Sequence, residues 1–566
     1  MRSLSARFSG ALGLGLLAFT ALACGGQTPA AAPDSQAKST GPKVQRLVLG
    51  INPPVNDTNS ASIQVSTSAW TNLPMWEDLF GVTPEGKEIV PMLATEWTLQ
   101  PDGQSYLIKL QRGVQFHDGK GEFTAKDVQF SLDDLKGETE AVAPAIPRTL
   151  NTIAGLDIVN DYEFLLRMRQ PDAGLLVAMS QAENIVKMRS KVDGEARTRR
   201  PTLEDRPLAG TGPYTYEAHG QAQYLRFKRA FDKHWRQTPD FPEFEFRYIK
   251  ENSTILAALL SKEIHVAALP PELTPQAEQR GFKTIEGKAP GLHVYATFRG
   301  VYLNQKIAND NQINADPNAK HVFPNSPLMD VRVRKALNKA IDREALNKAF
   351  LRGRGTPVYN EFFHPTRPGW NAAWERNFKD AYGYDPEAAK KLLVEAGYGP
   401  GKAAAVTMIL RPYPYFPGLF DMEEAITNHW RAVGIETKID QSDNATISAK
   451  DRQLAYDSHV YGIVTSVRQL AGVATYQSAL PGIGGRLGTE LPELDAIYGP
   501  IRRTLEPKQQ DELWRQWGDI AYNQYASIPL FWMPSEAVVD PEIVADYPFP
   551  GSISGIYTHV EYIKAK

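Results

Sequence analysis

Apolar residues recur along this chain with two different periods, and the helical period is the clearer of the two. Val333, Ala336, Leu337 and Ala340 follow one another at three- and four-residue spacings. This spacing places apolar side chains along one face of a helix. The pattern therefore predicts a single amphipathic helix over residues 331–349, with one face buried.

Helix-capping residues predict two further helices. Thr124 stands three residues before Asp127 in a capping-box pattern, in which the threonine hydroxyl caps one free amide and the acid reaches back to another. A helix is expected from there to about residue 136. Asp385 is a good N-cap, Pro386 fits the first helical position, and Gly397 suits a left-handed end. These three residues predict a helix between them.

Shorter patterns complete the expected secondary structure. Residues 425–433 repeat the helical spacing and end before Gly434. Runs that mix apolar and polar positions, as half-buried strands do, predict strands over residues 44–51, 106–110, 224–228 and 435–439. The alternation of strands and helices, without a fixed-period repeat, favours an α/β fold with mixed sheets.

Length and composition restrict the class of protein. A chain of 566 residues exceeds the size at which one hydrophobic core keeps growing, so at least two lobes are expected. Hydrophobic residues make up 42% and charged residues 22%, as in ordinary globular proteins. A net charge of -3 provides no basic surface for phosphates, so nucleic acid is not an expected partner. No apolar run after residue 44 is long enough to cross a membrane.

The single cysteine, Cys24, lies close to the N-terminus. Arg2 and Arg7 precede a short apolar stretch, residues 11–21, which is typical of a secretory signal peptide. Residues 21–24, Ala-Leu-Ala-Cys, resemble a bacterial lipobox, with leucine at the second position instead of the first. We expect Cys24 to be lipidated; the alternative is an ordinary signal peptide with an incidental cysteine. The following residues, to about 43, have the composition of a flexible tether.

Four sequence blocks, taken in order, resemble the family 5 extracellular solute-binding proteins of ABC importers, which include dipeptide, oligopeptide and nickel receptors. The resemblance covers most of the chain after the tether. The blocks are PMLATEW with DGQSY, GVQFHDG and FTAKDV (residues 91–128), GTGPY with FDKHW (210–235), DVRVRKAL with AIDR (330–343), and YDP with EAGY (384–398). Most of these residues are expected to be scaffold rather than binding site.

The resemblance implies an α/β, two-lobed periplasmic-binding-protein-like fold with mixed sheets and a discontinuous first lobe. The chain is expected to cross between lobes near residues 295–304 and 528–534. The implied divisions are a signal peptide (1–23), a lipidated Cys24 with its tether (24–43), lobe I (44–297 and 530–566) and lobe II (298–529).

The resemblance also suggests ligand-binding residues in lobe II. Arg411 and Tyr413 lie in the segment MILRPY, whose arginine holds the ligand carboxylate in the dipeptide-type receptors. A guanidinium offers two parallel donors that match a carboxylate. The alternative for Arg411 is a surface or structural ion pair. Ser466 stands where peptide receptors carry the aspartate that captures an ammonium group, and a serine cannot neutralise a buried ammonium.

Three further sites are weaker candidates. Arg468 would favour an anionic solute if it faced the cleft, and is otherwise a solvated loop charge. Trp70 and Trp76 are possible cleft walls, or core residues. Residues 52–58 follow the first predicted strand, and loops at strand ends commonly line binding sites.

No catalytic motif is visible, and no metal or cofactor is expected. The pair His117–Asp118 is interpreted as a turn, and residues 210–214 as a tight turn entering a strand. The expected function is a monomeric lipoprotein receptor that passes a small molecule or peptide to an ABC permease and its ATPase at the bacterial cell envelope. Alternatives are an exported hydrolase and an envelope sensor or scaffold. Residues 306–327 form an insertion of unassigned role.

Overall fold

The structure is a computed structural model, and all residues that it describes except Gly41 belong to one compact unit, Pro42–Lys566. The described residues are 41–54, 73–83, 88–136, 145–182, 186–198, 206–287, 290–304, 316, 318–410, 416, 418–466, 488–548 and 559–566.

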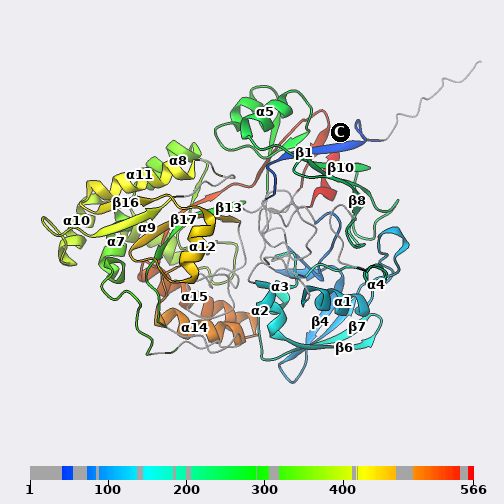
Figure 1. Ribbon diagram of the computed structural model, residues 1–566, viewed down its shortest axis with the longest axis horizontal. Coiled ribbons are helices and arrows are strands. Elements are labelled where there is room, and N and C mark those ends of the chain that lie inside the picture. Colours follow the sequence, from blue (N-terminus) through cyan, green and yellow to red (C-terminus); the bar gives the residue numbers. More distant parts are fainter. Residues whose placement is uncertain are drawn as a thin grey trace, which may run out of the picture. The chain divides into compact units, whose positions relative to one another are not determined.

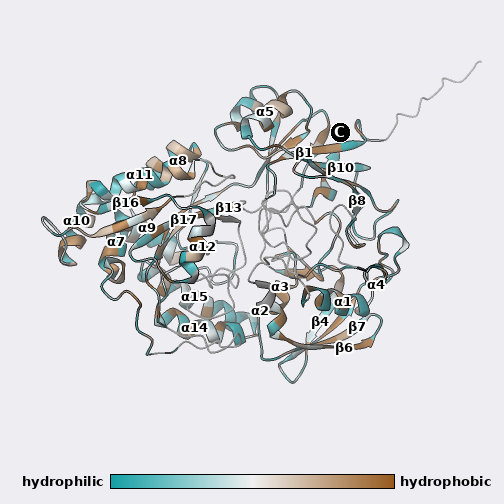
Figure 2. Cartoon of the chain, viewed as in Figure 1, coloured by the Kyte–Doolittle hydropathy of each residue, from teal (hydrophilic) through white to brown (hydrophobic). Residues whose placement is uncertain are grey.

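A seven-stranded mixed sheet carries the first strand of the described chain (Figure 1). Its order is β12 (Lys283–Glu286), β19 (Glu536–Val539), β11 (Val266–Ala267), β1 (Arg46–Ile51), β10 (Glu243–Tyr248), β9 (Tyr224–Arg229) and β8 (Tyr214–Gly220). The central strand β1 runs parallel to both of its neighbours, as expected for a strand buried on both faces. Figure 2 accordingly shows β1 and the neighbouring helix α5 (Asn252–Leu260) as largely hydrophobic.

A four-stranded antiparallel sheet is inserted between β1 and β8. Its order is β4 (Ala94–Leu99), β5 (Ser105–Leu110), β7 (Glu163–Met168) and β6 (Ile153–Asn160). It shares an apolar core with α1 (Ala125–Lys136) and α3 (Leu175–Ala178). Nearby are α2 (Ala145–Thr152), α4 (Lys191–Glu195) and the hairpin of β2 (Phe80–Val82) and β3 (Ile89–Pro91).

A six-stranded mixed sheet organises the middle of the chain. Its order is β14 (Thr356–Pro357), β18 (Ser527–Met533), β13 (Leu292–Arg299), β17 (His459–Ser466), β15 (Ala405–Ile409) and β16 (Glu436–Asp440). The helices among the described residues of this region are α7 (Val331–Lys339), α8 (Arg343–Leu351), α9 (Ala372–Tyr382), α10 (Pro386–Glu395), α11 (Leu419–Ala432), α12 (Asn444–Arg452), α14 (Pro492–Arg503) and α15 (Pro507–Asn523). All eight contribute to the core cluster that this sheet forms.

The chain changes from one large sheet to the other at two connections in the described structure. The first joins β12 to β13, between Glu286 and Leu292, and the second joins β18 to β19, between Met533 and Glu536. The expected lobe boundaries, after residues 297 and 529, fall inside β13 and β18. The changes of sheet occur in the connections next to these strands.

Most predicted elements are present, with shifts at their ends. The four predicted strands correspond to β1, β5, β9 and β16, and the capped helices correspond to α1 and α10. Asp385 caps α10 as predicted, since its carboxylate accepts a hydrogen bond from the amide of Ala388 at 2.9 Å. At α1 the acid reaches back as predicted, but the Thr124 hydroxyl donates to the same carboxylate instead of accepting an amide.

The single helix predicted over residues 331–349 is wrong, because two helices occupy that stretch. α7 ends at Lys339, and α8 begins at Arg343. The carboxylate of Asp342 accepts a hydrogen bond from the amide of Ala345, so a new N-cap interrupts the apolar period. The predicted helix over 425–433 also begins earlier, at Leu419.

Two predicted turns are confirmed. His117–Gly119 forms a short 3-10 helix in which Asp118 has a φ of 58°. Residues 210–214 lead directly into β8. The insertion, residues 306–327, is described in part. Within it the backbone carbonyl of Lys320 accepts a hydrogen bond from Asn304, and the amide of Val322 donates to Tyr302, so this portion folds back onto the chain that precedes it.

Candidate functional site

The residues predicted to bind ligand fall mostly outside the described part of the chain. This applies to Arg411, Tyr413, Arg468 and Trp70, and also to the lipidation candidate Cys24. Ser466 is the last residue of β17, and only its backbone is described.

Two other candidates from the first lobe are structural residues. Trp76 is a core side chain rather than a cleft wall, and its indole Nε1 donates a hydrogen bond to the carbonyl of Leu208 at 2.8 Å. Asn52, which follows β1, donates to the carbonyls of Ile249 and Lys250 and so ties two chain segments together.

Strand register nevertheless defines one edge of the six-stranded sheet as the candidate site. Ser466 at the end of β17 pairs with Leu292 at the start of β13, and Leu292 pairs with Met533 at the end of β18. Both connections to the seven-stranded sheet leave from this edge. The strand β15 runs parallel to β17 and ends at Ile409, which pairs with Tyr461. The segments that follow β15 and β17, which carry Arg411, Tyr413 and Arg468, therefore continue from strands that point toward the connections between the two sheets.

One face of β13 carries an unusual row of buried polar side chains. His293, Tyr295, Thr297 and Arg299 alternate with apolar residues, and all four are buried. The guanidinium of Arg299 lies 3.5 Å from the carboxylate of Asp451 and over the ring of Tyr461. A buried cation is tolerated when it is paired in this way.

His293 occupies the end of this row that is closest to the sheet edge. Its ring is stacked between those of Tyr295 and Trp532, with ring centroids at 4.4 and 4.3 Å. Burial, together with the charges of Arg367 and His364, holds the pKa of His293 well below its ordinary value. The imidazole is therefore neutral at pH 7, and its buried Nε2 makes no hydrogen bond in the structure.

A buried acid, Glu423, packs against β17 on the sheet face opposite to the polar row of β13. The carboxylate of Glu423, on α11, is seated against Gly462, where a β-carbon would lie 1.7 Å from its Oε1 atom. Glycine at this point of β17 is therefore required by the close approach of the acid.

A second buried network lies beside the seven-stranded sheet. Lys187 donates to Asp78 at 2.6 Å, and both side chains are buried. Burial raises the pKa of Asp78 to about 6, although Lys187 opposes this shift. Next to it, Arg236 bridges the carboxylates of Glu77 and Glu561 at 2.9 and 3.0 Å. Through Arg236 this network ties Glu561, near the C-terminus, to Glu77 in the first part of the chain.

The sequence does not reveal these buried groups, because single polar residues inside apolar strands resemble ordinary half-buried positions. The alternation His-x-Tyr-x-Thr-x-Arg in β13 and the glycine at the centre of β17 were the available signals. Neither signal identifies which chain segment packs against the strand concerned.

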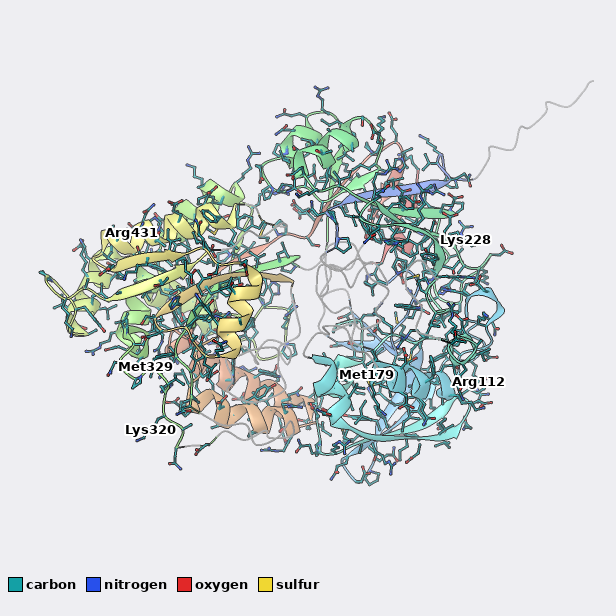
Figure 3. All side chains as sticks on the ribbon, in the orientation of Figure 1. Arg112, Met179, Lys228, Lys320, Met329 and Arg431 are labelled. Atoms are coloured by element: carbon teal, nitrogen blue, oxygen red, sulfur yellow. The ribbon has the colours of Figure 1, made fainter. Side chains whose placement is uncertain are left out.

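The described surface also contains a polar depression of about 490 Å³ at the edge of the four-stranded sheet. It includes Arg112, labelled in Figure 3, whose guanidinium lies over the ring of Tyr162 at 4.4 Å. The residues that line it are Thr95, Lys109, Leu110, Gln111, Arg112, Asn160, Tyr162 and Glu163. None of them was predicted to bind ligand.

The described residues show neither a metal-binding cluster nor a membrane-spanning helix. They contain no group of three or more histidine, cysteine, aspartate or glutamate side chains arranged to hold a metal ion. Among the same residues, no helix combines the length and the apolar character that crossing a membrane requires.

Comparison with known proteins gives related proteins over much of the chain. The dipeptide-binding protein of Escherichia coli (strain K12) is 27% identical over 399 residues, which are 66% of this chain and 68% of that protein. Heme-binding protein A of Haemophilus influenzae is 26% identical over 374 residues, 62% of this chain and 61% of that protein. The chain thus spans less than two thirds of the Haemophilus protein.

Solved structures show the same fold. NikA from Brucella suis, in complex with Fe(III)-EDTA, aligns over 92% of this chain and 100% of that chain with a TM-score of 0.73 and 18% identity. DppA from Helicobacter pylori, in complex with the peptide STSA, aligns over 92% and 98% with a TM-score of 0.67 and 18% identity. The two-lobed periplasmic-binding-protein fold predicted from the sequence is confirmed. The sequence profile of the bacterial extracellular solute-binding proteins, family 5 (Middle), matches residues 88–477, and the chain belongs to this family.

Proposed function

We propose that this protein is a receptor that captures a small solute between two lobes and delivers it to an ABC permease and its ATPase. The observation that carries the proposal is the pair of connections between the two large sheets, in a chain of this family. We place lobe I at residues 44–287 and 535–566, and lobe II at residues 292–533. A ligand that contacts both lobes stabilises the closed arrangement over the open one, because only the closed arrangement offers it both sets of contacts.

The proposed ligand carries a carboxylate. Relatives are named for binding a dipeptide, heme and glutathione. Arg411 follows β15 and would grip the carboxylate through its two parallel donors, with Tyr413 beside it. Arg468 and Trp70 would add a second cation and an aromatic wall. Ser466 replaces an acid in this scheme, so the receptor would not require a free ammonium group on its ligand.

We further propose that Cys24 is lipidated after removal of residues 1–23 and anchors the receptor to the outer face of a bacterial membrane through the tether that follows. Labelling of cells with a radioactive or clickable fatty acid would test this. Label should be incorporated into the wild-type protein and lost from the variant Cys24→Ser. Equal labelling of both proteins would contradict the anchor.

A thermal-shift screen of the mature protein tests the receptor function. The probes are peptides with free or blocked termini, other carboxylates, sugars and metal chelates. A specific ligand raises the melting temperature in proportion to the logarithm of its concentration. The variant Arg411→Ala should lose this shift for carboxylates, whereas Arg431→Ala, on the exposed side of α11, should retain it.

The same screen separates the receptor from an exported hydrolase. A receptor binds one ligand per chain and leaves it intact, whereas a hydrolase consumes it. Mass spectrometry of each stabilising compound after incubation is the readout. Product formation would overturn the receptor proposal. Binding that is unchanged in Arg411→Ala would leave the fold intact and reject the proposed carboxylate grip.

A further inference from the structure

The helix α14 belongs to lobe II but reaches lobe I. Its residues Leu494, Tyr498 and Ile501 are part of the apolar core of the six-stranded sheet, and α15 packs against it. At its C-terminal end, Arg502 forms an ion pair with Asp172, which lies between β7 and α3 in lobe I.

Lobe I also satisfies the backbone at the end of this helix. The carbonyls of the last helical turn have no partner within a helix. The carbonyl of Arg502 accepts a hydrogen bond of 2.8 Å from the amide of Ala173. Leu505, just beyond α14, packs against the apolar core of the four-stranded sheet. The contact thus combines an ion pair, a backbone hydrogen bond and apolar packing.

Asp172 is held in place by its own lobe. Its Oδ1 atom accepts a hydrogen bond from the amide of Gly174 at 2.9 Å, and its Oδ2 atom accepts one from the Thr152 hydroxyl at 3.2 Å. The side chains of Arg502 and Asp172 are only 11% and 6% exposed. Charge-assisted hydrogen bonds in such a shielded position are stronger than those on an open surface.

This contact is separate from both connections between the lobes. Asp172 follows a strand of the four-stranded sheet, whereas the connections join strands of the seven- and six-stranded sheets. When two lobes rotate about a connection, a contact between the lobes next to that connection is retained. A contact between the lobes elsewhere must break. Contact between Arg502 and Asp172 therefore reports closure of the lobes.

We propose that Arg502, Asp172 and Ala173 form a latch that holds the receptor closed in the absence of ligand. The inference rests on the proposed function, because it describes how the same two lobes move. The latch raises the fraction of empty receptor in the closed arrangement, and the apparent dissociation constant is inversely proportional to that fraction. None of these three residues is predicted to bind ligand, so the latch strengthens the binding of every ligand by the same factor.

The latch makes a measurable prediction without any ligand. Small-angle X-ray scattering of the ligand-free mature protein should give a larger radius of gyration for Arg502→Gln and for Asp172→Asn than for the wild type. Arg431→Gln removes the same charge from an exposed site and should leave the radius unchanged. Arg502→Lys keeps the charge but loses the planar fork, and tests the latch if Arg502→Gln does not fold.

Affinity gives the second readout. Any ligand identified by thermal shift should bind more weakly to Arg502→Gln, by up to about tenfold, because one charge-assisted hydrogen bond changes the closed-to-open ratio by about tenfold. The ratio between the affinities of two ligands should not change, whereas Arg411→Ala should change it. Equal radii for the wild type and both latch variants would overturn the latch. If none of the probes in the thermal-shift screen binds, the receptor function is rejected. The scattering result would still decide whether the latch exists.

Discussion

Arg354 forms an ion pair with Glu536, the first residue of β19, immediately after the second connection between the sheets. Glu286 of β12 pairs directly opposite Glu536 and lies 3.5 Å from the same guanidinium. One cation from the chain between α8 and β14 therefore serves two neighbouring carboxylates. This places an ionisable cluster beside a connection about which the lobes would rotate.

The cluster predicts a pH dependence of stability. Burial raises the pKa of Glu536 from 4.5 to about 7, although Arg354 opposes this shift. An acid whose pKa is raised on folding contributes stability that is full below its unfolded pKa and is lost as the pH rises through its folded pKa. This contribution should therefore fall between pH 4.5 and about 7. The variant Glu536→Gln should show a melting temperature that decreases less than that of the wild type across this window.

A control for this experiment is Glu286→Gln, which removes the more exposed of the two acids. That variant should lower the pKa of Glu536 by removing a repelling charge, and so move the loss of stability to lower pH. Identical melting profiles for wild type and Glu536→Gln between pH 4.5 and 8 would contradict the assignment.

The contact between Gly462 and Glu423 predicts a stability loss on adding one methyl group. In Gly462→Ala the new carbon would collide with the Glu423 carboxylate and displace a buried side chain. Overpacking of this kind costs about 1 to 3 kcal/mol. Urea denaturation should show a lower midpoint with an unchanged slope.

A double-mutant cycle checks the cause. In a Glu423→Ser background the collision is removed, so adding Gly462→Ala should cost less than it does in the wild type. Equal costs in both backgrounds would show that the loss comes from the strand backbone and not from the acid.

Local signals predicted most of the elements because each depends on a few adjacent residues. Asp385, Pro386 and Gly397 specify the two ends of α10 through hydrogen bonds and backbone angles within single turns, and Gly397 has the expected positive φ of 86°. The break between α7 and α8 could not be predicted in this way. The apolar period continues across Asp342, and only tertiary contacts select a new N-cap there.

The candidate site was less predictable, because its geometry depends on strand register between distant segments. The sequence alone does not show that Ser466, Leu292 and Met533 meet at one edge of a sheet. Nor does it show that His293 is enclosed by rings from β13 and β18. The resemblance implied the family and the fold, while the position of the candidate site depends on pairing between residues that are far apart in sequence, as in Leu292↔Ser466 and Leu292↔Met533.

The N-cap at Asp342 makes a prediction about the helix break. Removing the cap in Asp342→Ala should lower stability by about 1 kcal/mol, the usual cost of a lost N-cap. The two helices should not fuse, because the Arg343 guanidinium donates to the carbonyls of Pro529, Asn338 and Tyr382 and holds this corner in place. Circular dichroism should therefore show an unchanged helix content. Asp385→Ala, which removes a second N-cap, should cost a similar amount, and a helix content that rises in Asp342→Ala would contradict the tertiary origin of the break.

The buried pair of Lys187 and Asp78 predicts a large effect that depends on pH. Lys187→Met leaves a carboxylate in an apolar position, and removing one partner of a buried pair costs about 3 to 5 kcal/mol. Burial already raises the pKa of Asp78 to about 6, and loss of the lysine should raise that pKa further. The contribution of this acid to stability is full below pH 3.8 and is lost as the pH rises through its folded pKa. The deficit of the variant should therefore be largest above pH 6 and shrink toward pH 5.

The double variant Asp78→Asn with Lys187→Met removes both charges and should recover most of the stability at pH 7. A deficit that stays constant from pH 5 to 8 would show that Lys187 stabilises the fold through its packing alone.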